Sequence, residues 1–168
     1  MKIALESPLQ AEAVALVAEL DAHQAALYPP ESRHALDMAA LAQANVLFAI
    51  ARVEGKAMGC AALLVERGHA ELKRLYVRPA HRGRGVARAL LQFLEQQVAP
   101  RGCSLLKLET GTAQPDAIAL YRSMGFVPCG RFGNYGVDPL SVFMEKLLMT
   151  PQSLRSCPQG AEPGHPQS

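Results

Sequence analysis

The sequence predicts one α/β domain built on a mixed β-sheet, and three observations lead to this prediction. Apolar runs at residues 46–53, 58–66 and 70–77 are joined by tight turns, which is typical of an antiparallel meander. The third run leads through a turn into a helical pattern at 86–98 and then into another apolar run at 105–110, which indicates a parallel pair with a right-handed crossover. The chain of 168 residues, 49% hydrophobic and 19% charged, suits one globular core.

The N-terminal part predicts a short strand and a helix. Residues 2–5 are apolar enough for the strand. Ser7 followed by Pro8 has the pattern of an N-cap with proline at the first helical position. Apolar residues then recur at helical spacing to near Ala26, and the helix is expected to end before the prolines at 29 and 30.

The C-terminal part predicts a second crossover helix and a closing strand pair. Pro115 suits the first turn of this helix, and Gly125 suits the position just past its end. Residues 126–131 and 141–147 then indicate two antiparallel strands. From Thr150 the chain becomes polar and rich in proline and glycine, so we expect residues 1–149 to form the domain and 150–168 a disordered tail.

The turn between 71–77 and 86–98 has the features of an anion site. Gly83 and Gly85 lack Cβ, so the backbone can adopt positive φ and approach a bulky phosphate. The start of the following helix leaves N–H groups unpaired and adds the positive end of the helix dipole. Arginines are concentrated around this turn, at Arg78, Arg82, Arg84 and Arg88. The alternative is a surface turn with solvated arginines.

Two motifs resemble those of the GNAT superfamily of N-acetyltransferases. Residues 82–87, Arg-Gly-Arg-Gly-Val-Ala, fit its Gln/Arg-x-x-Gly-x-Gly/Ala signature, and residues 120–126 fit its Leu-Tyr-x-x-x-Gly-Phe helix end. The resemblance covers roughly 46–146, and bacterial members are similar also in the 28–37 and 132–141 segments. It implies the GNAT fold, a mostly antiparallel sheet of about six or seven strands with a parallel central pair and about four helices.

The resemblance also implies acetyl-CoA as cosubstrate. In this binding mode the glycine turn holds the pyrophosphate, a strand edge hydrogen-bonds the pantetheine arm, and an N–H near Val77 stabilises the oxyanion. Gln114 stands where many members have asparagine, so its contact with the arm has a longer reach. The residues that match are Leu75, Tyr76, Val77, Arg82, Gly83, Arg84, Gly85, Val86, Ala87, Arg88, Gln114 and Tyr121.

Acetyl transfer to an amine requires a base for the ammonium and an acid for the leaving thiolate. Glu71 or Glu109 could be the base, and Tyr121 matches the family's general acid. Each has an alternative: an ion pair with Lys73 for Glu71, a solvated strand end for Glu109, and a core tyrosine with a satisfied hydroxyl for Tyr121.

The acceptor is expected to be a small polar amine or amino acid rather than a protein. In the family the first-helix region lines the substrate cleft, although the prolines of residues 28–37 could simply connect two helices. The candidate acceptor-binding residues are Tyr28, Glu31, Ser32, His34, Tyr135 and Ser141. The predicted function is therefore direct transfer from acetyl-CoA to a primary amine. The alternative is a non-catalytic domain that senses acyl-CoA or binds a partner through its basic patch.

The composition and the spacing of particular residue types argue against several classes of partner and site. The net charge of +2 and the lack of aromatic residues among the arginines argue against nucleic acid. No run approaches eighteen apolar residues, so no membrane span is expected. The histidines never fall three or four residues apart, so no metal site is expected. Scattered cysteines indicate reduced thiols and a cytoplasmic location. The sequence itself indicates no oligomeric state, and homodimers are common in the family that it resembles, so a homodimer is one assembly that the resemblance allows.

Overall fold

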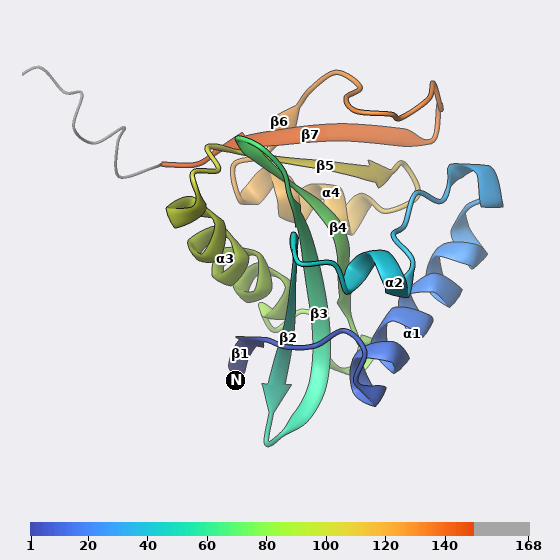
Figure 1. Cartoon of the computed structure of the whole chain (residues 1–168). Coiled ribbons are helices and arrows are strands. Elements are labelled where there is room, and N and C mark those ends of the chain that lie inside the picture. Colours follow the sequence, from blue (N-terminus) through green and yellow to red (C-terminus); the bar gives the residue numbers. More distant parts are fainter. Residues whose placement is uncertain (150–168) are drawn as a thin grey trace, which may run out of the picture.

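The computed structural model describes residues 1–149 and contains a seven-stranded mixed sheet with helices on both faces (Figure 1). The strand order is β1-β2-β3-β4-β5-β7-β6, and among these described strands only β4 and β5 pair in parallel. This confirms the predicted fold class. The tail predicted at 150–168 lies outside the described residues. The strands are β1 Lys2–Leu5, β2 Val46–Val53, β3 Lys56–Val65, β4 His69–Val77, β5 Leu105–Gly111, β6 Val127–Pro128 and β7 Ser141–Leu147.

The helices form a layer on each face of the sheet (Figure 1). One face is covered by α1 and α2, and the other by α3 and α4, so the apolar core has two parts. Within residues 1–149 no helix is long and apolar enough to cross a membrane. The helices are α1 Ala11–Leu27, α2 Met38–Leu41, α3 Val86–Val98 and α4 Pro115–Ser123, with single 3₁₀ turns η1 Pro30–Ser32, η2 Pro79–His81 and η3 Ala99–Arg101.

Helix α3 is anchored to the sheet by one apolar face. Its side chains Leu90, Leu94 and Val98 are completely buried, and Val86 and Leu91 nearly so. Burying a large aliphatic side chain contributes about 1.5–3 kcal/mol. This packing fixes the position of the turn that precedes α3, because α3 begins at Val86 directly after that turn.

Two predicted element boundaries are wrong. Helix α1 begins at Ala11 with Gln10 at its N-cap, and the Ser7 hydroxyl instead accepts a hydrogen bond from the Leu9 N–H (3.2 Å) in the preceding turn. Strand β6 is only Val127–Pro128, much shorter than the predicted 126–131. The proline N has no hydrogen to donate to the ladder, which limits the pairing of β6 with β7.

Tyr28, directly after α1, connects this helix to the loop between β5 and α4. Its hydroxyl accepts a hydrogen bond from the Ala113 N–H (3.1 Å) and donates one to Gln114 Oε1 (3.3 Å). The ring crosses Gly111 so closely that a Cβ there would overlap the phenol. Gly111 is therefore needed for close approach and not for an unusual backbone angle, and Tyr28 is buried as a result.

We predict that Gly111→Ala destabilises the fold, because the methyl group must displace the Tyr28 ring and break its hydrogen bonds with Ala113 and Gln114. The expected loss is about 1–3 kcal/mol in the free energy of unfolding, measured by urea denaturation. Gly130→Ala is the matched control, since nothing lies within 4 Å of a Cβ at Gly130. Equal stability of the two variants would contradict the assigned contact.

Candidate active site

The parallel strands β4 and β5 are paired along only part of β4. Their register runs from His69 opposite Leu105 to Leu72 opposite Leu108 and then stops. Strand β4 continues along β3 to Val77, whereas β5 continues along β7 to Gly111. The β3–β4 register shifts at Lys73, which has no partner and forms a β-bulge at the point of separation. The two strands therefore open into a V-shaped cleft.

The open edge of β4 presents unpaired backbone groups to this cleft. Arg78 N–H donates to the Met58 carbonyl (2.9 Å), so every second residue back along β4 faces β3. Leu75 and Val77 must then direct their N–H and C=O groups to the other side, where β5 no longer pairs. The Val77 carbonyl is occupied by Arg82 Nε (2.9 Å), but the two N–H groups have no strand partner. An extended ligand with amide groups can bind along such an edge.

The turn before α3 has the conformation that the two glycines predict. Gly83 and Gly85 adopt φ of +73° and +78°, and Gly85 is the N-cap of α3. No side chain caps this helix, so the N–H groups of its first turn are open to a ligand. A Cβ at either glycine would meet nothing within 4 Å, so the turn is free of covering side chains in the described part of the chain.

The four arginines near this turn have different partners, and Arg78 is paired with a carboxylate. Its guanidinium forms a bidentate pair with Glu19 (Nη2–Oε1 2.9 Å, Nε–Oε2 3.1 Å) and fastens α1 to the end of β4. Arg82 Nε donates a hydrogen bond to the Val77 carbonyl, and Arg88 Nη2 donates one to the Ser123 hydroxyl (2.6 Å) on α4. Arg84 is exposed and has no ion pair among residues 1–149.

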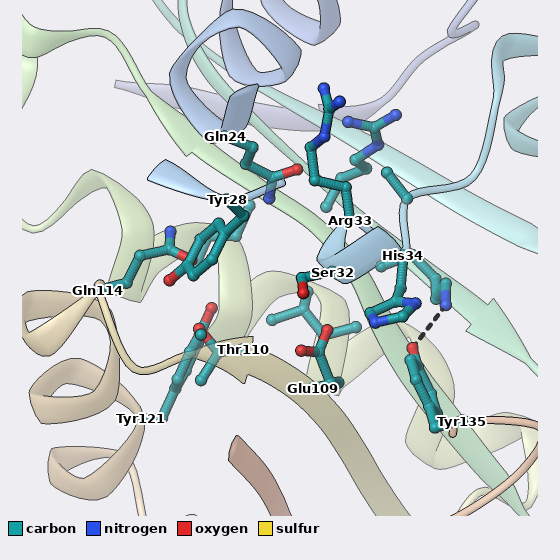
Figure 2. A pocket seen from close by; sticks show the side chains of 16 residues that line it. Gln24, Tyr28, Ser32, Arg33, His34, Glu109, Thr110, Gln114, Tyr121 and Tyr135 are labelled. Atoms are coloured by element: carbon teal, nitrogen blue, oxygen red, sulfur yellow. Dashed lines mark hydrogen bonds between the residues drawn. The ribbon is translucent and has the colours of Figure 1, made fainter. Parts of the chain in front are cut away.

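A pocket lies where the cleft meets the loop after α1 (Figure 2). Of the predicted acceptor-binding residues it brings together four: Tyr28, Ser32, His34 and Tyr135. Glu31 lines a separate shallow hollow between residues 29–34 and 136–140, and Ser141 does not line the pocket.

The predicted cofactor and catalytic residues divide between the pocket and the turn. Leu75, Glu109, Gln114 and Tyr121 line the pocket, whereas Val77 and residues 82–88 do not. The strands separate after Leu72, so along the open edge of β4 the Leu75 N–H lies nearer to the point of separation than the Val77 N–H, to which the resemblance assigned the oxyanion.

Charged residues that sequence reasoning did not select also line the pocket: Arg33, Lys73 and Arg74. The sequence shows that these residues are charged, but it does not predict the β-bulge that changes the direction of their side chains. Among residues 1–149 no three His, Cys, Asp or Glu side chains gather closely enough to hold a metal ion.

Glu71 is engaged in a buried network. Its carboxylate accepts hydrogen bonds from the Tyr135 hydroxyl and from Lys73 Nζ (3.2 Å), and Lys73 Nζ also bonds the Tyr135 oxygen (2.8 Å; Figure 2). Glu71 is 7% exposed. This is the ion pair with Lys73 that the sequence offered as the alternative to a catalytic role. Burial, followed by the bond to Glu71, raises the pKa of Tyr135.

Glu109 has different surroundings from Glu71. Burial raises its pKa to about 7, against the opposing effects of the Ser141 hydroxyl and the Lys73 charge. Glu109 is half-buried, and no cation lies within ion-pair distance of it among residues 1–149. A carboxylate with a pKa near neutrality can accept a proton and release it again.

Tyr121 faces both the core and the pocket. It is 6% exposed, and its ring packs edge-on against Phe126 with 5.7 Å between centroids. Burial raises its pKa, and the nearby Glu109 charge adds to the rise, so the phenol keeps its proton at neutral pH. Figure 2 shows Tyr121, Thr110 and Glu109 on the same side of the pocket. The position suits a proton donor and a core side chain equally.

The Gln114 amide is oriented by Tyr28. Because Gln114 Oε1 accepts from the Tyr28 hydroxyl, its NH₂ group is the end left to donate to a ligand. That group has no acceptor among the described residues. The shape of the cleft, its free amides and its polar walls together suit a ligand that combines an anionic group, an amide-bearing arm and a reactive end.

Comparison with known proteins identifies the family. Residues 14–126 match the model of the acetyltransferase (GNAT) family. The chain is 48% identical to the IAA acetyltransferase of Azospirillum brasilense over 148 residues, which are 87% of this chain and 97% of that protein. A crystal structure from Klebsiella pneumoniae, described as an acyl-CoA N-acyltransferase, is 39% identical with a TM-score of 0.75, covering 88% of this chain and 97% of that one.

A more distant structure shares the fold. An aminoglycoside 6′-N-acetyltransferase solved with coenzyme A is 17% identical, with a TM-score of 0.71 over 89% of this chain and 98% of that one. The two motifs, the mixed sheet with its diverging parallel pair, and these matches agree. The chain therefore belongs to the GNAT family of acetyltransferases and is an enzyme of the acyltransferase class.

Proposed function

We propose that the protein transfers the acetyl group of acetyl-CoA to a primary amine of a small polar molecule, by direct transfer within a ternary complex. The observation that supports this most is the separation of β4 and β5, which leaves the N–H groups of Leu75 and Val77 unpaired beside an uncapped helix N-terminus. The Klebsiella relative is described as acting with acyl-CoA, which agrees with this cosubstrate.

Acetyl-CoA would bind along the cleft from the turn to the pocket. The N–H groups of the turn and of the first residues of α3 would hold the pyrophosphate, helped by the Arg84 and Arg88 charges. The edge at Leu75–Val77 and the Gln114 NH₂ would bond the amides of the arm. In this binding mode the thioester would lie near Tyr121 and Glu109, which line the pocket at the inner end of the cleft.

We assign the general base to Glu109 and not to Glu71. Glu71 already accepts two hydrogen bonds from Tyr135 and Lys73, and taking up a proton would require one of them to break. Glu109 has no ion-pair partner among residues 1–149, and its raised pKa lies close to the pH at which it must act. It would take the ammonium proton, directly or through a water molecule, and free the amine lone pair for attack on the thioester carbonyl.

Tyr121 would donate its proton to the departing thiolate. The phenol is protonated at neutral pH, as a general acid must be before the step. An N–H of the open β4 edge would stabilise the negative charge on the carbonyl oxygen in the transition state. The direct test of the proposal is a coupled thiol-release assay with acetyl-CoA against amino acids, polyamines, aminoglycosides and peptides. Turnover of no small amine would contradict it.

The assignment of the turn predicts that Gly85→Ala weakens acetyl-CoA binding. The left-handed φ of +78° costs alanine about 1–2 kcal/mol, and the new Cβ would stand where the pyrophosphate approaches. Gly102→Ala is a matched control, because Gly102 has φ +80°, an equally open Cβ position and a place remote from the turn. Isothermal titration should show weaker binding only for Gly85→Ala. Equal affinities would contradict the assignment.

The raised pKa of Glu109 predicts how turnover depends on pH. Wild-type kcat should rise with pH through about 7, as the carboxylate loses its proton. Glu109→Gln should lose this limb of the profile and about 100-fold or more of kcat. Glu71→Gln should keep the limb, which separates the two carboxylates. A profile unchanged in Glu109→Gln would exclude Glu109 as the base.

The same group predicts a change of stability with pH. The folded pKa of about 7 lies above the ordinary value of 4.5, so the folded state binds this proton more tightly than the unfolded state. The contribution of Glu109 to stability should therefore decrease as pH rises from about 4.5 to about 7. Glu109→Gln should accordingly raise the Tm relative to wild type more at pH 8 than at pH 4, as measured by calorimetry.

The role given to Tyr121 predicts that Tyr121→Phe lowers kcat by about 100-fold while acetyl-CoA affinity changes little. The ring, its contact with Phe126 and its burial remain, so the thermal stability should be close to that of the wild type. Stopped-flow turnover and isothermal titration measure the two quantities. Unchanged kcat would leave Tyr121 as a core residue only.

A further inference from the structure

The charges around the acceptor pocket are segregated. The arginines Arg33 and Arg74 line the part of the pocket formed by the loop after α1 and by β4, and Glu109 lines the part formed by β5. In Figure 2, Arg33 and Glu109 lie on opposite sides of the pocket, with Ser32 and His34 between them. The pocket thus has a cationic side and a carboxylic side.

Arg74 is a buried cation with incomplete compensation. Its side chain is 3% exposed and bonds Asp21 and the Leu36 carbonyl (2.6 Å), while its Nε is buried with no acceptor among the described residues. The Asp21 side chain is 53% exposed, so water screens much of its charge. Burying a charge is costly unless it is well paired, so this wall would gain from additional negative charge.

Arg33 is the guanidinium group of the pocket that a ligand can contact directly. It is exposed, it borders the same pocket, and its guanidinium has no carboxylate partner among residues 1–149. The third cation of the pocket, Lys73, is already engaged by Glu71 and Tyr135. The free guanidinium fork of Arg33 is suited to a planar carboxylate, which it can bind through two parallel hydrogen bonds.

We propose that the acceptor carries a carboxylate as well as its amine, and that Arg33 binds this carboxylate while the amine lies toward Glu109. The acceptor class is thus an amino acid or a similar amino carboxylate. This proposal rests on the proposed function, because it takes the pocket as the acceptor site of an acetyl transfer. Arg74 stays in the wall and contributes its charge, and Arg33 selects the acceptor.

The orientation follows from simple electrostatics. With the carboxylate at Arg33 the amine points to the side of the pocket that has Glu109, which must remove its proton. Reversed binding would bring the ammonium against two guanidinium groups and the carboxylate against Glu109, and both contacts are repulsive. The pocket therefore favours one orientation of such an acceptor, and that orientation is the reactive one. A neutral or dicationic amine has no group that uses the Arg33 side.

The test uses matched acceptors with the full-length protein. Each amino acid is compared with its carboxamide and with its decarboxylated amine in the thiol-release assay. In the wild type, kcat/KM for the amino acid should exceed that for each partner by about tenfold or more, as expected for a hydrogen-bonded charge. Arg33→Ala should abolish this preference by raising KM for the amino acid, with kcat little changed. Arg33→Lys should recover part of it.

The controls separate this proposal from the proposed function. Arg67→Ala removes another exposed arginine, in the turn between β3 and β4, and should leave every ratio unchanged. Turnover of amides and decarboxylated amines as good as that of the amino acids, in wild type and Arg33→Ala alike, would overturn the carboxylate proposal and leave the acetyltransferase assignment intact. Turnover of no amine of either kind would instead overturn the proposed function.

Discussion

The site depends on the separation of two parallel strands. Hydrogen bonding between β4 and β5 stops after Leu72 and Leu108, because β5 follows β7 while β4 follows β3. A sheet normally satisfies the backbone groups of its central strands, and leaving them unpaired in the interior is costly. Here the unpaired edge lies beside a solvent-accessible cleft, where water can satisfy it and a ligand with amide groups can replace that water.

The bulge at Lys73 has a second effect, on side-chain direction. Side chains along a strand normally point to alternate faces of the sheet, and the extra residue in β4 interrupts this alternation. Lys73 and Arg74 are consecutive in the sequence but therefore both direct their side chains to the polar side of the cleft. Lys73 can then reach Glu71 and Tyr135, and Arg74 can reach Asp21 and the loop after α1. One irregularity in the ladder thus brings the polar groups of β4 to the loop that borders the pocket.

Features within one short segment could be predicted from the sequence, whereas those that join distant segments could not. The turn at Gly83 and Gly85 follows from local backbone preferences, as do the helix that starts at Val86 and the crossover that makes β4 and β5 parallel. The pairing of Arg78 with Glu19 joins residues 59 positions apart, and no spacing rule predicts it. The contact between the Tyr28 ring and Gly111 could not be predicted either, because the sequence does not distinguish a glycine required for close packing from any other glycine.

The two carboxylates of the site illustrate the same limit in chemical terms. Glu71 and Glu109 lie on neighbouring strands near the cleft, and sequence position favours neither as a base. Their environments differ: Glu71 accepts hydrogen bonds from a lysine and a phenol, whereas Glu109 is half-buried without an ion-pair partner and has its pKa raised to about 7. The Glu71 network also engages Lys73, the cation whose charge opposes the rise in the pKa of Glu109. In the proposed mechanism, the carboxylate held by these partners stays in the wall of the site and the other exchanges the proton.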